Sequence, residues 1–320
     1  MSAKQSDAST HTELGRGAEF DMIRELAARW QGVARGLGDD AALLDVGAGR
    51  RVLISSDASV ENVHFRREWL TGVEIGYRSA TAALSDLAAM GAEPLGITVA
   101  MVLPEQWRDD FGHLADGIAA ATRAADCPII GGDLSRGDSL TLSFTVIGTA
   151  AHPVLRSGAR AGQSVYLTGV LGGPLLALRA LERGAEPPVE HRRRFAQPVA
   201  RIPEGLWLAA RGAAAMIDVS DGLTSDAEHL ARASGAHLTI ELDKLPSIAG
   251  ADSQTAARSG EEYELLLTAS ALDSDAFRSA FHIPLTCIGT VSDDPENGSV
   301  SFTRGGLRVD LEKGYDHFSR

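Results

Sequence analysis

Residues 214–222, AAMIDVSDG, predict a short buried strand that runs into a loop with two aspartates. The same order of apolar strand and acidic end recurs at residues 52–57, VLISSD, and at residues 128–133, PIIGGD. Helices are predicted over residues 74–90 and 107–125, between these strands. Strands that alternate with helices are typical of an α/β fold. Side chains at strand ends are the usual site residues of such folds, so the aspartates are the first candidates for function.

The length of 320 residues favours two domains of ordinary size. The character of the sequence changes near residue 150, where a turn-like stretch precedes a second run of strands and helices. We therefore expect an α/β (α+β) protein with a disordered tail over residues 1–15, an N-terminal domain over 16–150 and a C-terminal domain over 151–320. Residues 184–203 are rich in Pro, Arg and Glu, which favours a surface excursion.

The composition excludes several classes of protein. A formal charge of −13 argues against sequence-independent binding to nucleic acid, which requires a basic face. The longest apolar stretch, residues 95–103, is far shorter than the roughly 20 residues that cross a bilayer. Two distant cysteines, Cys127 and Cys287, indicate reduced thiols rather than a disulfide framework or a zinc site. We expect a cytoplasmic protein without a nucleic-acid or membrane partner.

The aspartates form the most informative pattern in the sequence. Seven of them follow glycine turns or apolar strands, or lie among small apolar residues: Asp39, Asp40, Asp57, Asp86, Asp133, Asp218 and Asp221. Carboxylates that converge would repel one another, and divalent cations are the common remedy. Mg²⁺ prefers oxygen ligands and shares them with substrate phosphates. The pattern therefore indicates a polynuclear Mg²⁺ site that binds a nucleotide, although any one aspartate is equally well explained as a turn or cap residue.

The familiar phosphate-binding motifs are missing. No G-x-x-x-x-G-K-[ST] loop occurs, and the glycine-rich stretch over residues 169–173 lacks the G-x-G-x-x-G spacing. A nucleotide enzyme of this sequence would hold phosphates through metal ions, arginine and loop amides.

Seven motifs occur in a fixed order along the chain. They are GDDAA at 38–42, SSD at 55–57 with VENVHF at 60–65, LSDLAAMGA at 84–92, IGGD at 130–133, RSGA at 156–159, IDVSDGL at 217–223 and GEEYEL at 260–265. This ordered set resembles the thiamine-monophosphate kinase family of the aminoimidazole-ribonucleotide-synthase-like superfamily. The resemblance spans nearly the whole chain after the tail.

The resemblance implies ATP-dependent, direct in-line phosphorylation of thiamine monophosphate to thiamine diphosphate with several Mg²⁺ ions. It implies these metal ligands: Asp40, Ser55, Ser56, Asp57, Asp86, Asp133, Asp218 and Asp221. It implies that ATP contacts Gly132, Asp133, Arg156 and Ser220, and that thiamine monophosphate contacts His64, Glu261 and Tyr315. No residue is expected to act covalently, because the metal cluster and Arg156 would position the phosphates. The resemblance also implies a homodimer in which the N-terminal mixed sheets, of the ATP- and Mg-binding domain, pair into a barrel beside the C-terminal α/β domains.

The chain departs from the family pattern at four positions: Asn62 and Ser259 replace glycines, Ser56 replaces threonine and Glu262 replaces aspartate. The substrate contacts also have structural alternatives. His64 could be a half-buried histidine, Tyr315 a packing aromatic and Glu261 a surface charge. Two other functions stay open: a purine cycloligase-like relative that also uses ATP, and a non-catalytic regulator that binds nucleotide or metal.

Overall fold

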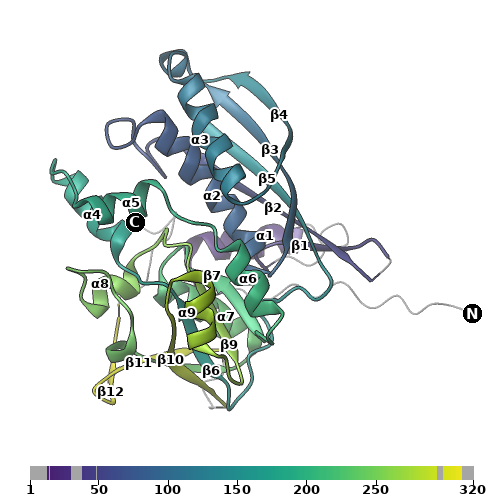
Figure 1. The fold of residues 1–320 in the computed structure, drawn as a ribbon, viewed down its shortest axis with the longest axis vertical. Helices are drawn as coiled ribbons and strands as arrows, with labels where there is room; N and C mark the ends of the chain where they lie inside the picture. The colour runs from purple at the N-terminus through teal and green to yellow at the C-terminus, as the bar shows by residue number, and fades with distance from the viewer. Residues whose placement is uncertain (1–12, 14, 30–37, 48, 294–297, 312–320) are drawn as a thin grey trace, which may run out of the picture.

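The computed structural model describes residues 13, 15–29, 38–47, 49–293 and 298–311. The predicted tail over 1–15 therefore lies almost wholly outside the described residues. The described chain forms two mixed sheets, each with its own helices (Figure 1). The expected two-domain α/β architecture is confirmed at this level. None of the helices in the described ranges is both long and apolar enough to span a bilayer.

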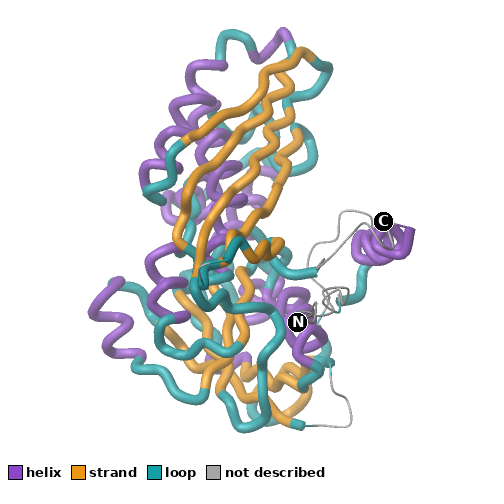
Figure 2. The backbone as a smooth tube through the Cα atoms, turned by 90° about the vertical axis from the view of Figure 1, so that its right-hand side faces the viewer, coloured by secondary structure: helices purple, strands orange, loops and turns teal. Residues whose placement is uncertain are grey.

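The first sheet has five strands in the order β1-β2-β5-β3-β4. Its strands are β1 Ala42–Asp45, β2 Arg51–Val60, β3 Glu93–Leu103, β4 Ile129–Arg136 and β5 Thr141–Ala150. Only β3 and β4 pair in parallel, and the other neighbours are antiparallel. Two helices, α2 Gly72–Ala89 and α3 Phe111–Ala124, cover one face of this sheet (Figure 2).

Helix α2 begins at a capping box, in which Thr71 and Glu74 satisfy each other's backbone amides. Small residues let it pack closely. The carbonyl of Leu114 would lie 2.2 Å from a Cβ at Gly76, so only glycine fits where α2 meets α3. Most of the helix is buried, including Ser85 and Arg78. A helix buried on most of its surface can carry polar groups into the middle of a protein, and α2 does so.

The second sheet has seven strands in the order β12-β11-β8-β10-β6-β9-β7. The strands are β6 Ser164–Thr168, β7 Ala215–Asp218, β8 His237–Glu241, β9 Leu265–Ala269, β10 Leu285–Ser292, β11 Val300–Arg304 and β12 Leu307–Val309. The helices of this half are α4 Gly173–Glu182, α5 Val189–Ala196, α6 Ile202–Ala209, α7 Leu223–Ser234, α8 Ser253–Arg258 and α9 Ser274–Phe281. Helix α1, Ala18–Arg29, precedes the first sheet in the chain.

Two local predictions are wrong at least in part. Residues 184–186 and 188–190 are exposed as expected of a surface excursion, but α5 lies within residues 184–203 and Phe195 is buried in the core. The acidic ends predicted for two strands are also misplaced: β2 continues past Asp57 to Val60, and β4 continues past Asp133 to Arg136. Polar side chains fit inside these strands because most residues of β2 are only partly buried or exposed and all of β4 is exposed.

Candidate active site

Three aspartates from distant parts of the chain form an acidic cluster. Asp40, Asp86 and Asp218 each place a carboxylate oxygen within 4.8 Å of the others. Asp40 lies in the loop before β1, Asp86 on α2, and Asp218 is the last residue of β7. The hydroxyl of Ser55 donates to Asp86 Oδ2 at 2.5 Å, and that of Ser85 donates to Asp218 Oδ2 at 2.6 Å. The cluster therefore joins the two domains through helix α2.

Negative charge is in excess in this cluster. Burial, with repulsion from Asp218 and Asp40, raises the pKa of Asp86 well above its ordinary value. Burial, with repulsion from Asp40, raises the pKa of Asp218 to about 7. Arg156 balances part of the charge through a bidentate pair with Asp40, with distances of 2.8 Å and 3.0 Å. A set of oxygen donors with excess negative charge is suited to a hard divalent cation such as Mg²⁺.

We expect the melting temperature of the metal-free protein to fall by at least about 3 °C between pH 5 and pH 8. A carboxyl whose pKa is higher in the folded state than in the unfolded state stabilises the fold at low pH. The contribution of Asp218 is complete below pH 3.8 and is lost as pH rises through about 7. One pKa unit is worth about 1.4 kcal/mol, and each kcal/mol moves the midpoint by roughly 2–4 °C. Differential scanning calorimetry in a chelator measures this change.

The matched control for this pH dependence is Asp218→Asn, which removes the titrating group and keeps its shape. The variant should show a flatter profile than the wild type, and it should gain less stability from Mg²⁺ at pH 8. Identical profiles for the two proteins would contradict the electrostatic description of the cluster.

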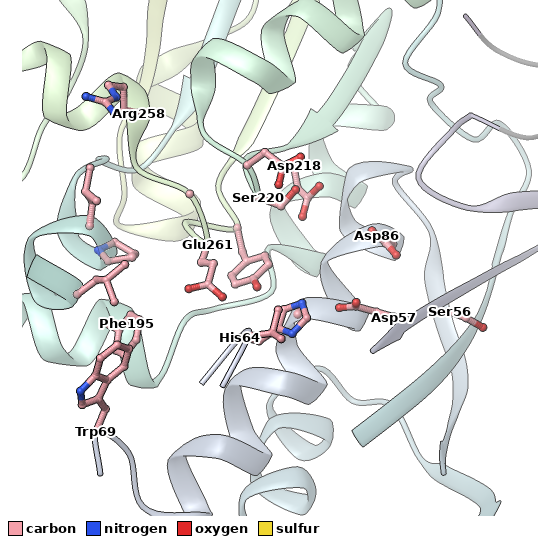
Figure 3. Close-up of a pocket in the computed structure, with 18 residues that line it drawn as sticks. Ser56, Asp57, His64, Trp69, Asp86, Phe195, Asp218, Ser220, Arg258 and Glu261 are labelled. Atoms are coloured by element: carbon pink, nitrogen blue, oxygen red, sulfur yellow. The ribbon is translucent and has the colours of Figure 1, made fainter. Parts of the chain in front are cut away.

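The acidic cluster opens into a pocket of about 390 Å³ between the domains (Figure 3). This volume lies within the range of small-molecule sites. Eight of the predicted site residues line it: Ser56, Asp57, His64, Asp86, Asp218, Ser220, Asp221 and Glu261. Its other end is apolar and includes Trp69, Leu175, Leu178 and Phe195. The sequence motifs contain no sign of this apolar end, because such side chains cannot be told from ordinary core residues in the sequence.

His64 lies on the loop that follows β2. Its Nδ1 accepts a hydrogen bond from the amide of Val60 at 3.0 Å, so Nε2 is the nitrogen that carries the proton in the neutral ring. Asn62, one of the departures from the family pattern, has a φ of 65°. Asparagine tolerates this left-handed conformation, which explains how it replaces glycine here.

Glu261 lies on a strained loop that is fastened to the acidic loop after β7. Glu261 and Tyr263 have φ values of 55° and 53°. The amide of Glu261 donates to the carbonyl of Ser220 at 2.6 Å, and the amide of Tyr263 donates to that of Val219 at 2.9 Å. These hydrogen bonds therefore hold the loop of Glu261 against the loop that carries Asp218 and Asp221.

The other two departures from the family pattern face away from the pocket. Glu262 is buried, pairs with Arg194 at 2.8 Å and accepts from the amide of Gly172 at 2.5 Å. The hydroxyl of Ser259 accepts from the amide of Leu175 at 3.2 Å. Both residues therefore support the loop from behind.

Gly132 and Asp133 lie away from the pocket within one chain. Gly132 is opposite Val99, which is opposite Phe144, which is opposite Asp57. The row spans three inter-strand spacings, roughly 14 Å. Asp133 accepts from the hydroxyl of Ser135 at 3.0 Å on the exposed strand β4. The remaining substrate residue predicted from the sequence, Tyr315, lies outside the described residues.

Two family descriptions match the chain in order. The N-terminal domain of AIR synthase related proteins matches residues 38–150, and the C-terminal domain matches residues 160–301. The two matches together span well over half of the chain.

Curated relatives match over nearly their full length. The thiamine-monophosphate kinase of Salmonella typhimurium is 36% identical over 94% of this chain and 96% of its own length. That of Bacillus subtilis is 30% identical over 94% of this chain and 99% of its own length.

Two solved structures are also similar to this chain over nearly its whole length. AaThiL complexed with AMPPCP and TMP has a TM-score of 0.82 at 28% identity, and the match covers 98% of this chain and 100% of that chain. Thiamine-monophosphate kinase from Stenotrophomonas maltophilia K279a has a TM-score of 0.74 at 34% identity, covering 92% and 98%. The similarity therefore includes both domains.

Proposed function

This chain belongs to the AIR synthase related family, and from that premise we propose that it phosphorylates thiamine monophosphate to thiamine diphosphate with ATP. The family resemblance expected from the motifs is confirmed. One observation carries the assignment to this pocket: an acidic cluster and an apolar chamber meet in a single cavity, lined by the residues of the family motifs.

The main electrostatic problem of this reaction is the approach of two phosphate-bearing anions. The nucleophile is a phosphate oxygen, largely deprotonated at neutral pH because the second pKa of a phosphate monoester is about 6. No strong general base is needed, and catalysis depends on alignment and charge neutralisation. Arg156 presents a planar guanidinium that suits phosphate, and its pair with Asp40 fixes its orientation beside the cluster.

We propose Mg²⁺ as the cation of the acidic cluster, since the donors there are carboxylate and hydroxyl oxygens. The side chains that would hold it within one chain are Asp40, Ser55, Ser56, Asp57, Asp86, Asp218 and Asp221. Bound Mg²⁺ would supply charge neutralisation between the two phosphates. The raised pKa values of Asp86 and Asp218 in this cluster support the proposal, because a cation would relieve the repulsion between the carboxylates.

For the rest of the pocket we propose the division that the motifs imply. Ser220, which lies in the acidic loop between Asp218 and Asp221, would contact ATP. His64, Glu261 and Tyr315 would contact thiamine monophosphate. The apolar end around Trp69 supports this arrangement, since an aromatic face is a favourable neighbour for a flat cationic ring. Cys127 and Cys287 are both free thiols, which supports the cytoplasm as the place of the reaction.

Turnover tests the function directly. The purified chain is incubated with ATP, MgCl₂ and thiamine monophosphate, and thiamine diphosphate is separated by chromatography. We expect formation of thiamine diphosphate with equimolar ADP, and no reaction with unphosphorylated thiamine, because the acceptor is a phosphate oxygen. Binding of ATP without any product at any Mg²⁺ concentration would instead favour a regulator. Turnover only of a purine precursor would favour the cycloligase.

A homodimer is the proposed assembly, formed through the first sheet. Strand β4 is an edge of that sheet, and Ile129, Ile130 and Leu134 on it are each about half exposed. An exposed apolar edge strand is a template for pairing with another chain. Pairing there would also give Gly132 and Asp133 a role in the neighbouring subunit, although they lie far from their own pocket.

We expect light scattering at micromolar concentration to give twice the mass of one chain, and Leu134→Lys to shift the protein to the monomer. Pairing would bury the introduced lysine charge in an apolar interface, and the removal of a charge from water is unfavourable. Leu307→Lys is the matched control, because Leu307 is an exposed residue on β12, the edge strand of the second sheet. A monomeric wild type, or equal effects of the two variants, would contradict this assembly.

A further inference from the structure

A buried arginine stands behind the substrate side of the pocket. Arg78 lies on α2, and only 4% of its side chain is exposed. Arginine is almost never buried to this degree unless an acid pairs with it. Arg78 lies on the same helix as Asp86, so its contacts bear on the geometry of the site.

Arg78 has two partners. Its guanidinium forms an ion pair with Glu261 and lies 4.3 Å from the ring centroid of Phe195. Neither terminal nitrogen has a hydrogen bond of good geometry to any described residue. Glu261 is its only ion-pair partner in the described ranges, so the two side chains depend on each other.

Glu261 faces the pocket while it is held from behind. Its Oε1 is the atom paired with Arg78, and 32% of its side chain remains exposed. Figure 3 shows the carboxylate directed into the pocket near His64. Within the described part of the chain, Arg78 is the only ion-pair partner of the Glu261 carboxylate, so loss of this pair leaves that carboxylate without a countercharge.

We propose that Arg78 is a positioning residue, which holds the Glu261 carboxylate so that it recognises the cationic ring of the substrate. This inference rests on the proposed function, which supplies the cationic ring. Helix α2 then sets both ends of the site. Arg78 and Asp86 are eight residues apart, or about 12 Å along a helix. The helix thereby fixes the distance between the residues that recognise the ring and the residues beside the phosphates.

Steady-state kinetics of Arg78→Gln test the role. We expect KM for thiamine monophosphate to rise roughly tenfold, which corresponds to about 1.4 kcal/mol of lost binding free energy. KM for ATP and kcat should stay within about twofold, because the lost contact is made equally in ground and transition states. Arg78→Lys keeps the buried charge and should recover most of the affinity, even where Arg78→Gln folds poorly.

A double-mutant cycle separates positioning from a merely structural role. In the Glu261→Gln background, Arg78→Gln should have no further effect on KM. The matched control is Arg232→Gln, since Arg232 pairs with Glu228 at 3.2 Å on α7 and neither residue lines the pocket. This control should leave both KM values unchanged.

Three outcomes would overturn the inference. A fall in KM for thiamine monophosphate in Arg78→Gln would mean that Arg78 only screens Glu261. Equal rises in both KM values would mean a structural role, as would an undiminished effect in the Glu261→Gln background. If the wild type forms no thiamine diphosphate, the proposed function fails instead.

Discussion

Asp57→Asn and Asp221→Asn are each expected to slow thiamine diphosphate formation by at least about a thousandfold, since the lost charge stabilisation is worth several kcal/mol. The two carboxylates line the same pocket from different domains: Asp57 lies on β2, and Asp221 lies in the loop after β7. Asparagine keeps the shape of each side chain and removes its charge. The loss should therefore appear in kcat, because charge is needed most where the two phosphates meet.

Both variants should keep the fold. Each carboxylate lines the open pocket rather than the closed core, so the melting temperature should stay within about 2 °C, as for most substitutions away from core features. Asp116→Asn is the control, because Asp116 is exposed on α3. Coupled measurement of ADP release gives the rates, and calorimetry gives the melting temperatures. Near-normal rates in both pocket variants would contradict a role of these carboxylates in catalysis.

Local patterns predicted the acidic loop correctly. Asp218 is the last residue of β7, and α7 begins at Leu223 after the loop. This prediction succeeded because β7 is fully buried, so its apolar residues end where the strand ends. The strand that carries Asp57 is half exposed, and there polar residues do not mark an end. The residue pattern therefore predicts the end of a strand only where both faces of that strand are buried.

Convergence of the aspartates was predictable in part. The motifs indicated which carboxylates are candidate ligands, and three of these, Asp40, Asp86 and Asp218, do lie together. The distance of Asp133 from them was not predictable, because it depends on strand order and register. No spacing in the sequence encodes that β5 inserts between β2 and β3.

The charged residues behind the pocket gave no signal in the sequence. An arginine on a helix normally lies in solvent, and residues 184–203 are rich in Pro, Arg and Glu, which favoured a surface position. Arg78 and Arg194 are nevertheless buried or nearly so, because acids from the loop over residues 261–264 meet them there. Such pairs arise from tertiary packing between segments more than 60 residues apart.

The ion network beneath this loop has Glu264 at its centre. The side chain of Glu264 is fully buried and accepts four hydrogen bonds. Arg201 donates two of them, at 2.6 Å and 2.9 Å, Arg194 donates one at 3.0 Å, and Thr168 donates one at 2.7 Å. Burial raises the pKa of Glu264, but the two arginines outweigh it and lower the pKa below its ordinary value. The group is therefore ionised and fully paired in the folded state.

Glu264→Gln should lower the free energy of unfolding by about 3 kcal/mol or more, because it leaves buried arginines short of a counter-charge. The melting temperature should fall by roughly 6–12 °C in a protein of this size. Glu190→Gln is the matched control, since Glu190 pairs with Arg193 at 2.8 Å on the exposed side of α5. That substitution should change the melting temperature by less than about 2 °C, as is usual for surface pairs.

The pH dependence distinguishes a lost charge from a lost shape in Glu264→Gln. A carboxyl with a lowered pKa stabilises the fold above its ordinary pKa of 4.5 and loses that contribution as pH falls through the lowered value. The difference between wild type and variant should therefore persist from pH 8 to about pH 5 and shrink only in more acidic solution. Urea unfolding across this range measures it. A difference that does not change with pH would indicate that hydrogen-bond geometry, rather than charge, holds the loop in place.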